Sequence, residues 1–396
     1  MKPSHQQNIQ VSNETQQNIS FKTLWHNALA QQLSVALWRL PQTSEKHLVV
    51  DFSGETKQVK ADFETLTSGF IVSPFLNPDL TKTYFIEANA HVSSEKGWLK
   101  GTAEQQQLLS SKNATESTNF LPTFTQDVSC PSFTAAHYQE IVAKAVAEMQ
   151  RGSFQKVVLS RKKLVPLAPN FEAVALFDKL CKAYPNAFVS LFSLPSVGVW
   201  LCATPELLVS TDENQTFRTI ALAGTQAAAQ AISQTSWTHK EIEEQAMVSR
   251  YIVNCFKKIR LREYTETGPR TVAAGNLLHL RTDFEVDMQA TNFPQLGTVM
   301  QELLHPTSAV CGMPKPEATA FILANENYDR SLYSGFLGPV NVNGQCQTFV
   351  HLRCTQLFDG YAVLYAGAGI TADSNPAKEW QETELKCQTL GTIISE

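Results

Sequence analysis

The chain has 396 residues, of which 43% are hydrophobic, and this is enough apolar material to bury a large core. Its formal net charge is −5, and no segment carries the cluster of basic residues that proteins use to hold phosphate backbones. We therefore expect no nucleic-acid partner, and a small anionic ligand would need positive charge concentrated in a pocket.

The N-terminal segment 1–20 is rich in Gln, Asn and Ser, a composition that predicts disorder. It has neither the apolar stretch of a signal peptide nor the Arg-rich pattern of a transit peptide. No apolar run in the chain approaches the length of about 18 residues that spans a membrane. Eight scattered cysteines with no CxxC pair indicate reduced thiols, so the sequence predicts a cytoplasmic protein without a membrane partner.

The next region, residues 21–131, is expected to be β-rich and to end in a linker. Short segments such as 49–52 and 83–86 have the composition of strands, and the polar stretch 102–131 is typical of a linker over the surface. From residue 132 to residue 396 the hydrophobic pattern becomes sharper, which indicates a second and larger region.

Helices and strands alternate irregularly in this larger region. Apolar residues recur at helical spacing from Tyr138 to Met149, and Gly152 provides a stop. Two long helices are predicted at 239–261 and 376–393. The other predicted elements are a helix at 171–183 and strands at 156–160, 187–193, 197–202, 206–211, 217–222, 271–281, 334–342, 345–356 and 361–367, the last three joined by hairpin turns. The mixture predicts an α+β fold with large, mostly antiparallel sheets.

Two pairs of glutamates lie on the two long predicted helices. Glu241 and Glu244 are three residues apart, as are Glu379 and Glu382, so each pair shares one helix face. If these faces oppose each other, four carboxylates converge, and such a cluster needs a hard cation such as Mg²⁺. Each pair taken alone equally fits an ordinary solvated helix face.

Lys156 and Glu206 are candidates for proton transfer. Lys156 lies on an apolar strand, where burial would lower the pKa of its amine and make it a general base. Glu206 follows Pro205 beside apolar residues, where burial would raise the pKa of its carboxyl and make it a general acid. A lysine at a strand end and a glutamate in a surface turn are the plain alternatives for the two segments.

Small-residue turns and two cations complete the set of candidates. Gly224 follows one predicted strand and Gly367 ends another, and glycines at such positions allow a close backbone approach to an anion. Arg353 lies in a strand pattern and can hold a carboxylate with two hydrogen bonds, while Lys386 lies one helical turn beyond Glu382.

Eight short motifs occur in order along this region. They are KVVLSR at 156–161, ATPELL at 203–208, LAGT at 222–225, KEIEE at 240–244, LHPT at 304–307, LYSG at 332–335, AGAGI at 366–370 and EWQET at 379–383. In this order, residues 133–396 resemble the chorismate-binding catalytic domain shared by isochorismate synthase, salicylate synthase, anthranilate synthase component I and aminodeoxychorismate synthase. The resemblance implies a two-lobed α+β fold with antiparallel sheets, outer helices and a cleft between the lobes.

The resemblance also implies roles for individual residues. Glu244 and Glu382 would bind Mg²⁺ directly, and Glu241 and Glu379 would act on it through water. The metal would hold the ring carboxylate of chorismate. The enolpyruvyl carboxylate would be held by Tyr333, Arg353, the Gly367 backbone and Lys386, and the ring would be lined by Gly224, Thr225, His279 and Ala309. Family members are commonly monomers, which is the expectation here.

Two positions indicate which nucleophile is used. Relatives that add water carry a lysine at the position of Lys156, which removes a proton from the attacking water, and anthranilate synthases lack it. Aminodeoxychorismate synthases carry a nucleophilic lysine where this chain has Ala223. The resemblance therefore implies water as nucleophile and Glu206 as the acid for the departing C4 hydroxyl, which makes the chain similar to isochorismate synthases.

Several alternatives stay open at this stage. The chain length resembles that of isochorismate synthases that feed 2,3-dihydroxybenzoate and siderophores, while menaquinone-pathway versions and salicylate synthases tend to be longer. A salicylate synthase would use the same residues and then eliminate pyruvate. An amine-transferring synthase and a non-catalytic chorismate-binding relative are the other two readings. The chain departs from the family pattern at Gln245, His351 and the turn 226–229, which leaves the ordering of that turn open.

Overall fold

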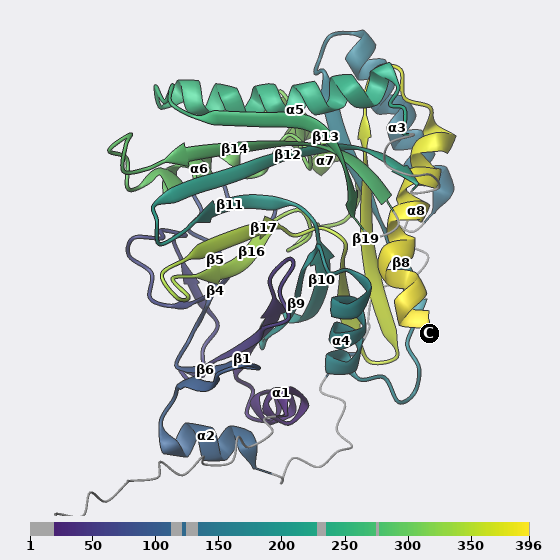
Figure 1. Cartoon of the computed structure of the whole chain (residues 1–396). Coiled ribbons are helices and arrows are strands. Elements are labelled where there is room, and N and C mark those ends of the chain that lie inside the picture. Colours follow the sequence, from purple (N-terminus) through teal and green to yellow (C-terminus); the bar gives the residue numbers. More distant parts are fainter. Residues whose placement is uncertain (1–19, 112–120, 124–133, 228–234, 275–276, 396) are drawn as a thin grey trace, which may run out of the picture.

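The computed structural model describes residues 20–111, 121–123, 134–227, 235–274 and 277–395. Two large antiparallel sheets pack face to face, and helices cover their outer surfaces (Figure 1). The α+β fold with large antiparallel sheets and outer helices, expected from the sequence, is confirmed. The expected disorder of residues 1–20 falls almost entirely outside the described residues.

The first sheet has ten strands, and the first and the last strand along the chain both belong to it. In spatial order they are β15 (Gly312–Met313), β8 (Lys156–Pro166), β19 (Tyr361–Ile370), β18 (Cys354–Phe358), β10 (Gly198–Thr204), β9 (Phe188–Leu194), β1 (Ser34–Arg39), β2 (Lys46–Asp51), β6 (Ala90–Ser93) and β7 (Gly97–Lys100). Strands β1 and β9 pair from Val35 opposite Ser193, so strands from both sides of residue 131 share this sheet. The division of the chain at residues 131 and 132 stays a prediction.

The second sheet has nine strands and is built in the same mixed way. In spatial order they are β13 (Thr265–Ala274), β14 (Leu277–Asp287), β12 (Thr216–Ala227), β11 (Leu207–Thr211), β17 (Cys346–Val350), β16 (Phe336–Val340), β4 (Gly69–Ser73), β5 (Thr83–Glu87) and β3 (Lys57–Val59). Strand β4 pairs with β16 from Ser73 opposite Phe336, which joins the N-terminal strands to this sheet.

The helices begin and end where the sequence provides caps and stops. Helix α3 begins after Thr134, whose hydroxyl accepts a hydrogen bond from the His137 backbone N–H, and Gly152 follows its end with a φ of +84°. The helices are α1 (Phe21–Ala30), α2 (Ala103–Ser110), α3 (Ala135–Gln150), α4 (Ala173–Ala183), α5 (His239–Lys258), α6 (Leu296–Leu304), α7 (Lys315–Asn325) and α8 (Pro376–Ser395). In the described part of the chain, no helix combines the length and the hydrophobicity needed to span a bilayer.

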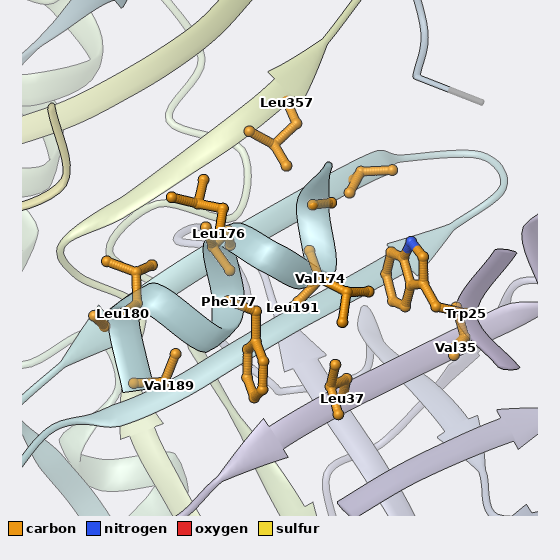
Figure 2. Close-up of a cluster of buried hydrophobic side chains, with 14 of the residues drawn as sticks. Trp25, Val35, Leu37, Val174, Leu176, Phe177, Leu180, Val189, Leu191 and Leu357 are labelled. Carbon is orange, nitrogen blue, oxygen red and sulfur yellow. The ribbon is translucent and has the colours of Figure 1, made fainter. Parts of the chain in front are cut away.

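Apolar cores fill the space between the sheets and beneath the helices. Between the sheets, Phe188 of the first sheet stacks on Phe349 of the second, with their ring centroids 4.2 Å apart. Figure 2 shows the core under helix α4, where Phe177 and Leu180 lie close to Leu37 and Val189 of the ten-stranded sheet. Full burial of a side chain such as Phe177 contributes about 1.5–3 kcal/mol, so these layers hold the helices against the sheet.

The structure corrects several element boundaries. The single strand expected at 345–356 is wrong: β17 ends at Val350, and β18 begins at Cys354 in the other sheet. The strand expected at 271–281 is two strands, β13 and β14, which pair as a hairpin. The expected linker at 102–131 begins with helix α2, and most of its remainder lies outside the described residues. The predicted helices at 171–183, 239–261 and 376–393 are confirmed as α4, α5 and α8.

Candidate active site

A cavity lies where the chain passes twice from one sheet to the other. Glu206 stands in the first crossing, between β10 and β11, and Arg353 stands in the second, between β17 and β18. The two crossings are hydrogen-bonded to each other's strands: the Val350 backbone N–H donates to the Glu206 carbonyl at 2.9 Å, and the Ala203 N–H donates to the Arg353 carbonyl at 3.0 Å. Both side chains are therefore fixed by backbone contacts next to the cavity.

The cavity brings together every residue that the sequence analysis placed around the substrate. These are Gly224, Thr225, His279, Ala309, Tyr333, Arg353, Gly367 and Lys386, and they line the same cavity as Glu206 and Glu244. Further lining residues that were not predicted as site residues are Val158, Pro205, Leu222, Ala223, Val310, Leu352, Tyr365, Ala366 and Gly369. Several of these lie within the recognised motifs, so motif membership was the signal that would have found them.

Glu206 is a buried acid at the wall of the cavity. Its residue is 6% exposed, and burial raises the pKa of its carboxyl to about 7, against the opposing effect of the nearby cations Lys156, Arg353 and Lys386. A carboxyl with a pKa near 7 is protonated in a large fraction of the molecules at neutral pH and can give this proton away. This is the property that a general acid requires.

Arg353 points its guanidinium into the cavity from a constrained backbone position. Its φ is +47°, a left-handed conformation that is uncommon for a residue other than glycine and that often marks a functional position. Its Nη1 donates to the Thr389 hydroxyl at 3.1 Å and its Nη2 contacts His279 Nε2 at 3.4 Å. Among the described residues, no carboxylate forms an ion pair with Arg353, so its charge is available to an anionic ligand.

His279 supports this arginine as a neutral side chain. Burial, with a further contribution from the Arg353 charge, lowers the pKa of the His279 imidazole to about 3. The neutral ring donates its Nδ1 proton to the Gly224 carbonyl over 2.7 Å, which leaves Nε2 as an acceptor facing Arg353. His279 thus ties the Gly224 turn to the arginine. The turn requires glycine, because φ is +68° and a Cβ at this position would lie 3.2 Å from the Glu241 Cβ.

Lys156 is fully buried immediately behind the cavity wall. Its Nζ lies 2.9 Å from Glu244 Oε1. The end of strand β19 next to this pair leaves no room for a side chain at Gly369. A Cβ at Gly369 would come within 2.5 Å of Glu244 Oε1 and 3.1 Å of Lys156 Cε. Although burial acts to raise it, the pKa of the Glu244 carboxyl is lowered, because Lys156, Lys386 and Lys240 outweigh the effect of burial.

Lys386 forms the opposite corner of the cavity. Its Nζ bonds to Glu382 at 2.7 Å and to the Gly367 carbonyl at 2.8 Å, so it connects helix α8 to strand β19. Gly367 has no room for a side chain, since a Cβ there would lie 2.9 Å from the Tyr333 hydroxyl. Tyr333 in turn stacks on Tyr365 with a centroid distance of 5.4 Å. These contacts bring the Lys386 amine, the Tyr333 hydroxyl and the accessible backbone of Gly367 together at one corner of the cavity.

The four glutamates expected to converge are held apart by separate partners. Glu244 pairs with Lys156 and Glu382 with Lys386, while Glu379 pairs with Lys240 at 2.6 Å. Glu241 accepts hydrogen bonds from the Thr238 backbone and hydroxyl and thus caps helix α5. Within the described residues, no three His, Cys, Asp or Glu side chains gather closely enough to hold a metal ion.

The donor chemistry of these glutamates nevertheless suits a hard divalent cation. They offer carboxylate oxygens, and the Glu379 Oε2 is buried with no hydrogen-bond partner in the described structure. The charges also act on one another. Burial lowers and the carboxylates raise the pKa of Lys240, and the rise caused by Glu379, Glu382 and Glu244 prevails. The helices α5 and α8 therefore bring three carboxylates within electrostatic reach of one amine.

The three departures from the family pattern have structural explanations only in part. Gln245 is buried, and its Nε2 donates to the Thr282 hydroxyl at 3.0 Å and to the Ala221 carbonyl at 3.2 Å, so it ties α5 to the nine-stranded sheet. His351 is fully buried between Phe192 and Trp200. Of the unusual turn 226–229, residues 226 and 227 end strand β12, and residues 228 and 229 lie outside the described residues.

Comparison with known proteins places this cavity in a family. The family model described as chorismate binding enzyme matches residues 5–395. Isochorismate synthase EntC of Escherichia coli (strain K12) is 29% identical over 264 residues, which cover 65% of this chain and 66% of that protein. The salicylate synthase of Mycolicibacterium paratuberculosis is 30% identical over 269 residues, which cover 65% of this chain and 58% of that protein. The matches thus span less than two thirds of the length of these curated relatives.

A solved structure extends the likeness over nearly the whole chain. The structure of MenF, the menaquinone-specific isochorismate synthase from Escherichia coli, has a TM-score of 0.72 and 18% sequence identity, and it covers 96% of this chain and 92% of that one. At this identity the comparison establishes a shared fold. Because the family model matches almost every residue of the sequence, the chain belongs to the chorismate-binding enzyme family.

Proposed function

We propose that the protein is an isochorismate synthase, an isomerase that converts chorismate to isochorismate. The observation that carries the proposal is the pairing of two features at one cavity. A buried acid with a raised pKa, Glu206, faces a space bordered by cations, and one of these, Arg353, has no carboxylate partner among the described residues. An anionic substrate that loses a hydroxyl group needs both features.

The reaction is an exchange of hydroxyl groups on the ring. The oxygen of a water molecule bonds to C2 and loses a proton to Lys156, the ring double bonds shift, and the C4 hydroxyl leaves with a proton from Glu206. One water enters and one water departs, so the reaction is balanced without a further reactant. Lys156 lies beside the cavity and can act as base once Glu244 exchanges its ion pair with this lysine for another partner, and the pKa of Glu206 near 7 supports its role as acid.

The two carboxylates of chorismate would bind at different ends of the cavity. Arg353, Tyr333, Lys386 and the Gly367 backbone would hold the enolpyruvyl carboxylate, because they form the cationic corner of the cavity. Gly224, Thr225, His279 and Ala309 would line the ring.

Mg²⁺ is the cofactor that fits the glutamates best. Glu244 and Glu382 would bind it, with Glu241 and Glu379 acting through water, and the ion would neutralise and orient the ring carboxylate of chorismate when it is bound. The oxygen-only donor set and the unpartnered Glu379 Oε2 support this proposal. In this structure Glu244 forms an ion pair with Lys156, and Glu382 forms one with Lys386. Binding of Mg²⁺ therefore requires these two carboxylates to change partners.

A salicylate synthase is the second candidate, since a relative of that name is 30% identical to this chain. It would add elimination of pyruvate in the same cavity. We propose that the product feeds 2,3-dihydroxybenzoate and siderophore formation, since the relatives include the vibriobactin-specific isochorismate synthase of Vibrio cholerae, and growth complementation of strains blocked in either route distinguishes this from the menaquinone route. A cytoplasmic location fits the seven cysteines of the described residues, all of which are free thiols, and the monomeric state stays a prediction.

Product analysis tests the proposal. The purified protein is incubated with chorismate and Mg²⁺ without ammonia, and the products are separated by chromatography. The expected product is isochorismate alone. Salicylate with pyruvate would move the protein to the second candidate, and turnover only with added ammonia would contradict water as nucleophile. Conversion that survives a metal chelator would contradict the Mg²⁺ site.

Three variants test the assigned roles. Lys156→Ala and Glu206→Gln are expected to abolish turnover while chorismate binding persists, because neither side chain is assigned to hold a carboxylate. Glu244→Ala is expected to remove turnover together with its Mg²⁺ dependence. Full activity in the Lys156 or Glu206 variant would refute the acid and base roles.

A further inference from the structure

The guanidinium of Arg353 is held by a residue outside the cavity. Thr389 lies on the last turns of helix α8 and is only 3% exposed, and its hydroxyl accepts a hydrogen bond from Arg353 Nη1 at 3.1 Å. Thr389 is fixed in turn, because the Tyr184 hydroxyl at the end of helix α4 donates to the Thr389 carbonyl at 2.6 Å. A chain of two hydrogen bonds therefore runs from α4 through α8 to the arginine.

A second cavity explains why this arginine needs a fixed partner. A space of about 180 Å³ lies on the far side of Arg353 and is also bordered by Pro205, Thr389 and Tyr184. Arg353 and Pro205 border this rear cavity and the candidate active site, so they form the partition between them. The rear cavity has room for several water molecules, and a long side chain next to such a space can turn into it.

The other contacts of the guanidinium restrain it less firmly. The approach of Nη2 to His279 Nε2 is 3.4 Å, which is long for a hydrogen bond, and no carboxylate among the described residues pairs with this side chain. The bond to the Thr389 hydroxyl is thus the shortest side-chain hydrogen bond that Arg353 makes in the described structure. Hydrogen bonds to charged groups are stronger than those between neutral groups, so one hydroxyl can set the direction of the guanidinium.

We propose that Thr389 is a positioning residue, which fixes the guanidinium of Arg353 at the partition between the active site and the rear cavity, so that it does not swing further into the rear space. It touches no reacting atom, and its effect appears in the affinity for the substrate carboxylate that Arg353 binds. This inference rests on the proposed binding of chorismate in this cavity.

Thr389→Val is the informative variant, since it removes the hydroxyl and keeps the side-chain shape. Chorismate affinity is measured by titration calorimetry, and KM and kcat are measured in parallel. We expect Thr389→Val to weaken binding and raise KM about tenfold with kcat little changed, and Thr389→Ser to restore both to within about twofold of the original protein. Equal affinity in the Val variant and the original protein would overturn the inference.

A matched control and a double variant separate positioning from folding. Thr355→Val removes an equally buried hydroxyl, one that donates to the Val363 carbonyl at 3.0 Å, and it should leave chorismate affinity unchanged. In an Arg353→Ala background, Thr389→Val should weaken binding no further, because its effect passes through the arginine. Additive losses in the double variant would show that Thr389 acts on the fold and would overturn the inference.

The same experiments distinguish this inference from the proposed function. A protein that binds chorismate without converting it would refute the proposed function, and the binding data would still decide the role of Thr389. Normal turnover by the original protein together with unchanged binding by the Val variant would refute only the role of Thr389. A protein that does not bind chorismate would overturn both.

Discussion

The pKa values of two carboxyls in one cavity are shifted in opposite directions because their surroundings differ. Burial dominates at Glu206 and raises its pKa to about 7, whereas at Glu244 the neighbouring lysines overcome burial and lower the pKa. Such a difference is how proteins assign acid and anion roles to similar side chains. The apolar sequence beside Glu206 left burial and a surface turn both open, and the ion pair between Glu244 and Lys156 joins residues 88 positions apart and depends on the fold.

The raised pKa of Glu206 predicts a pH-dependent stability. The folded protein binds this proton more tightly than the unfolded chain, so the stabilisation is complete below pH 4.5 and is lost as the pH rises through about 7. At pH 9 the Glu206→Gln variant should be the more stable protein, by an amount on the order of 3 kcal/mol, and the advantage should vanish below pH 4.5. Denaturant unfolding of both proteins across this pH range measures the difference, and a difference that does not change with pH would contradict the burial argument.

Gly369 offers a second test at the scale of one residue. Gly369→Ala places a methyl group against the Glu244 carboxylate and the Lys156 side chain, and the flexible ends of these side chains can move without loss of the fold. We expect turnover to fall about a hundredfold while thermal stability changes little, because displacement of a catalytic group by about 1 Å has this effect. Gly391→Ala is the matched control, since its Cβ would make only an ordinary 3.6 Å contact with Leu364. Equal activities of the two variants would contradict the placement of Lys156.

At the scale of elements, the strand crossings are what sequence patterns could not reveal. The apolar pattern of 345–356 is continuous, yet the chain leaves one sheet after Val350 and enters the other at Cys354, with Arg353 between them at a positive φ. Both halves are buried strands, so hydrophobicity does not mark the change of sheet. The long helices were predicted well because their amphipathic spacing and caps are local properties, whereas helices α6 and α7 were missed.

A buried ion pair fixes strand β8 beneath the cavity. Arg330 and Glu326 are each 2–3% exposed, and Arg330 donates to the Val158 carbonyl at 2.6 Å and to the Val310 carbonyl at 2.9 Å. The same Glu326 accepts from the Ser160 N–H at 2.7 Å. These bonds connect β8, which carries Lys156, to the segment that lines the opposite wall.

Removal of one partner should therefore be costly. Arg330→Met leaves the Glu326 carboxylate buried without its cation, and we expect a loss of about 3–5 kcal/mol in the free energy of unfolding. Arg151→Met breaks the exposed pair with Glu148, in which the arginine side chain is 72% exposed, and should cost less than about 1 kcal/mol. Urea unfolding compares the two variants, and similar losses would show that the buried pair does not brace β8.

At the scale of the whole molecule, the site exists because two sheets and two helices meet at one place. Figure 1 shows α5 running along one edge of the molecule and α8 along another. Glu244 of α5 and Lys386 of α8 line the same cavity, and Lys240 of α5 pairs with Glu379 of α8. The resemblance to the chorismate-binding family, carried by the motifs and their order, implied which residues share the cavity. Which glutamate pairs with which lysine depends on how the helices pack, and this was not readable from spacing.

The central claim is that water is the nucleophile which this cavity activates. Chorismate is incubated with the protein and Mg²⁺ in water enriched in ¹⁸O, and the isochorismate formed is analysed by mass spectrometry. The account predicts that the new C2 hydroxyl carries the ¹⁸O label in every turnover and that Lys156→Ala yields no labelled product. Isochorismate that forms without the label would mean that the C4 hydroxyl migrates within the substrate, and this would contradict the roles of Lys156 and Glu206.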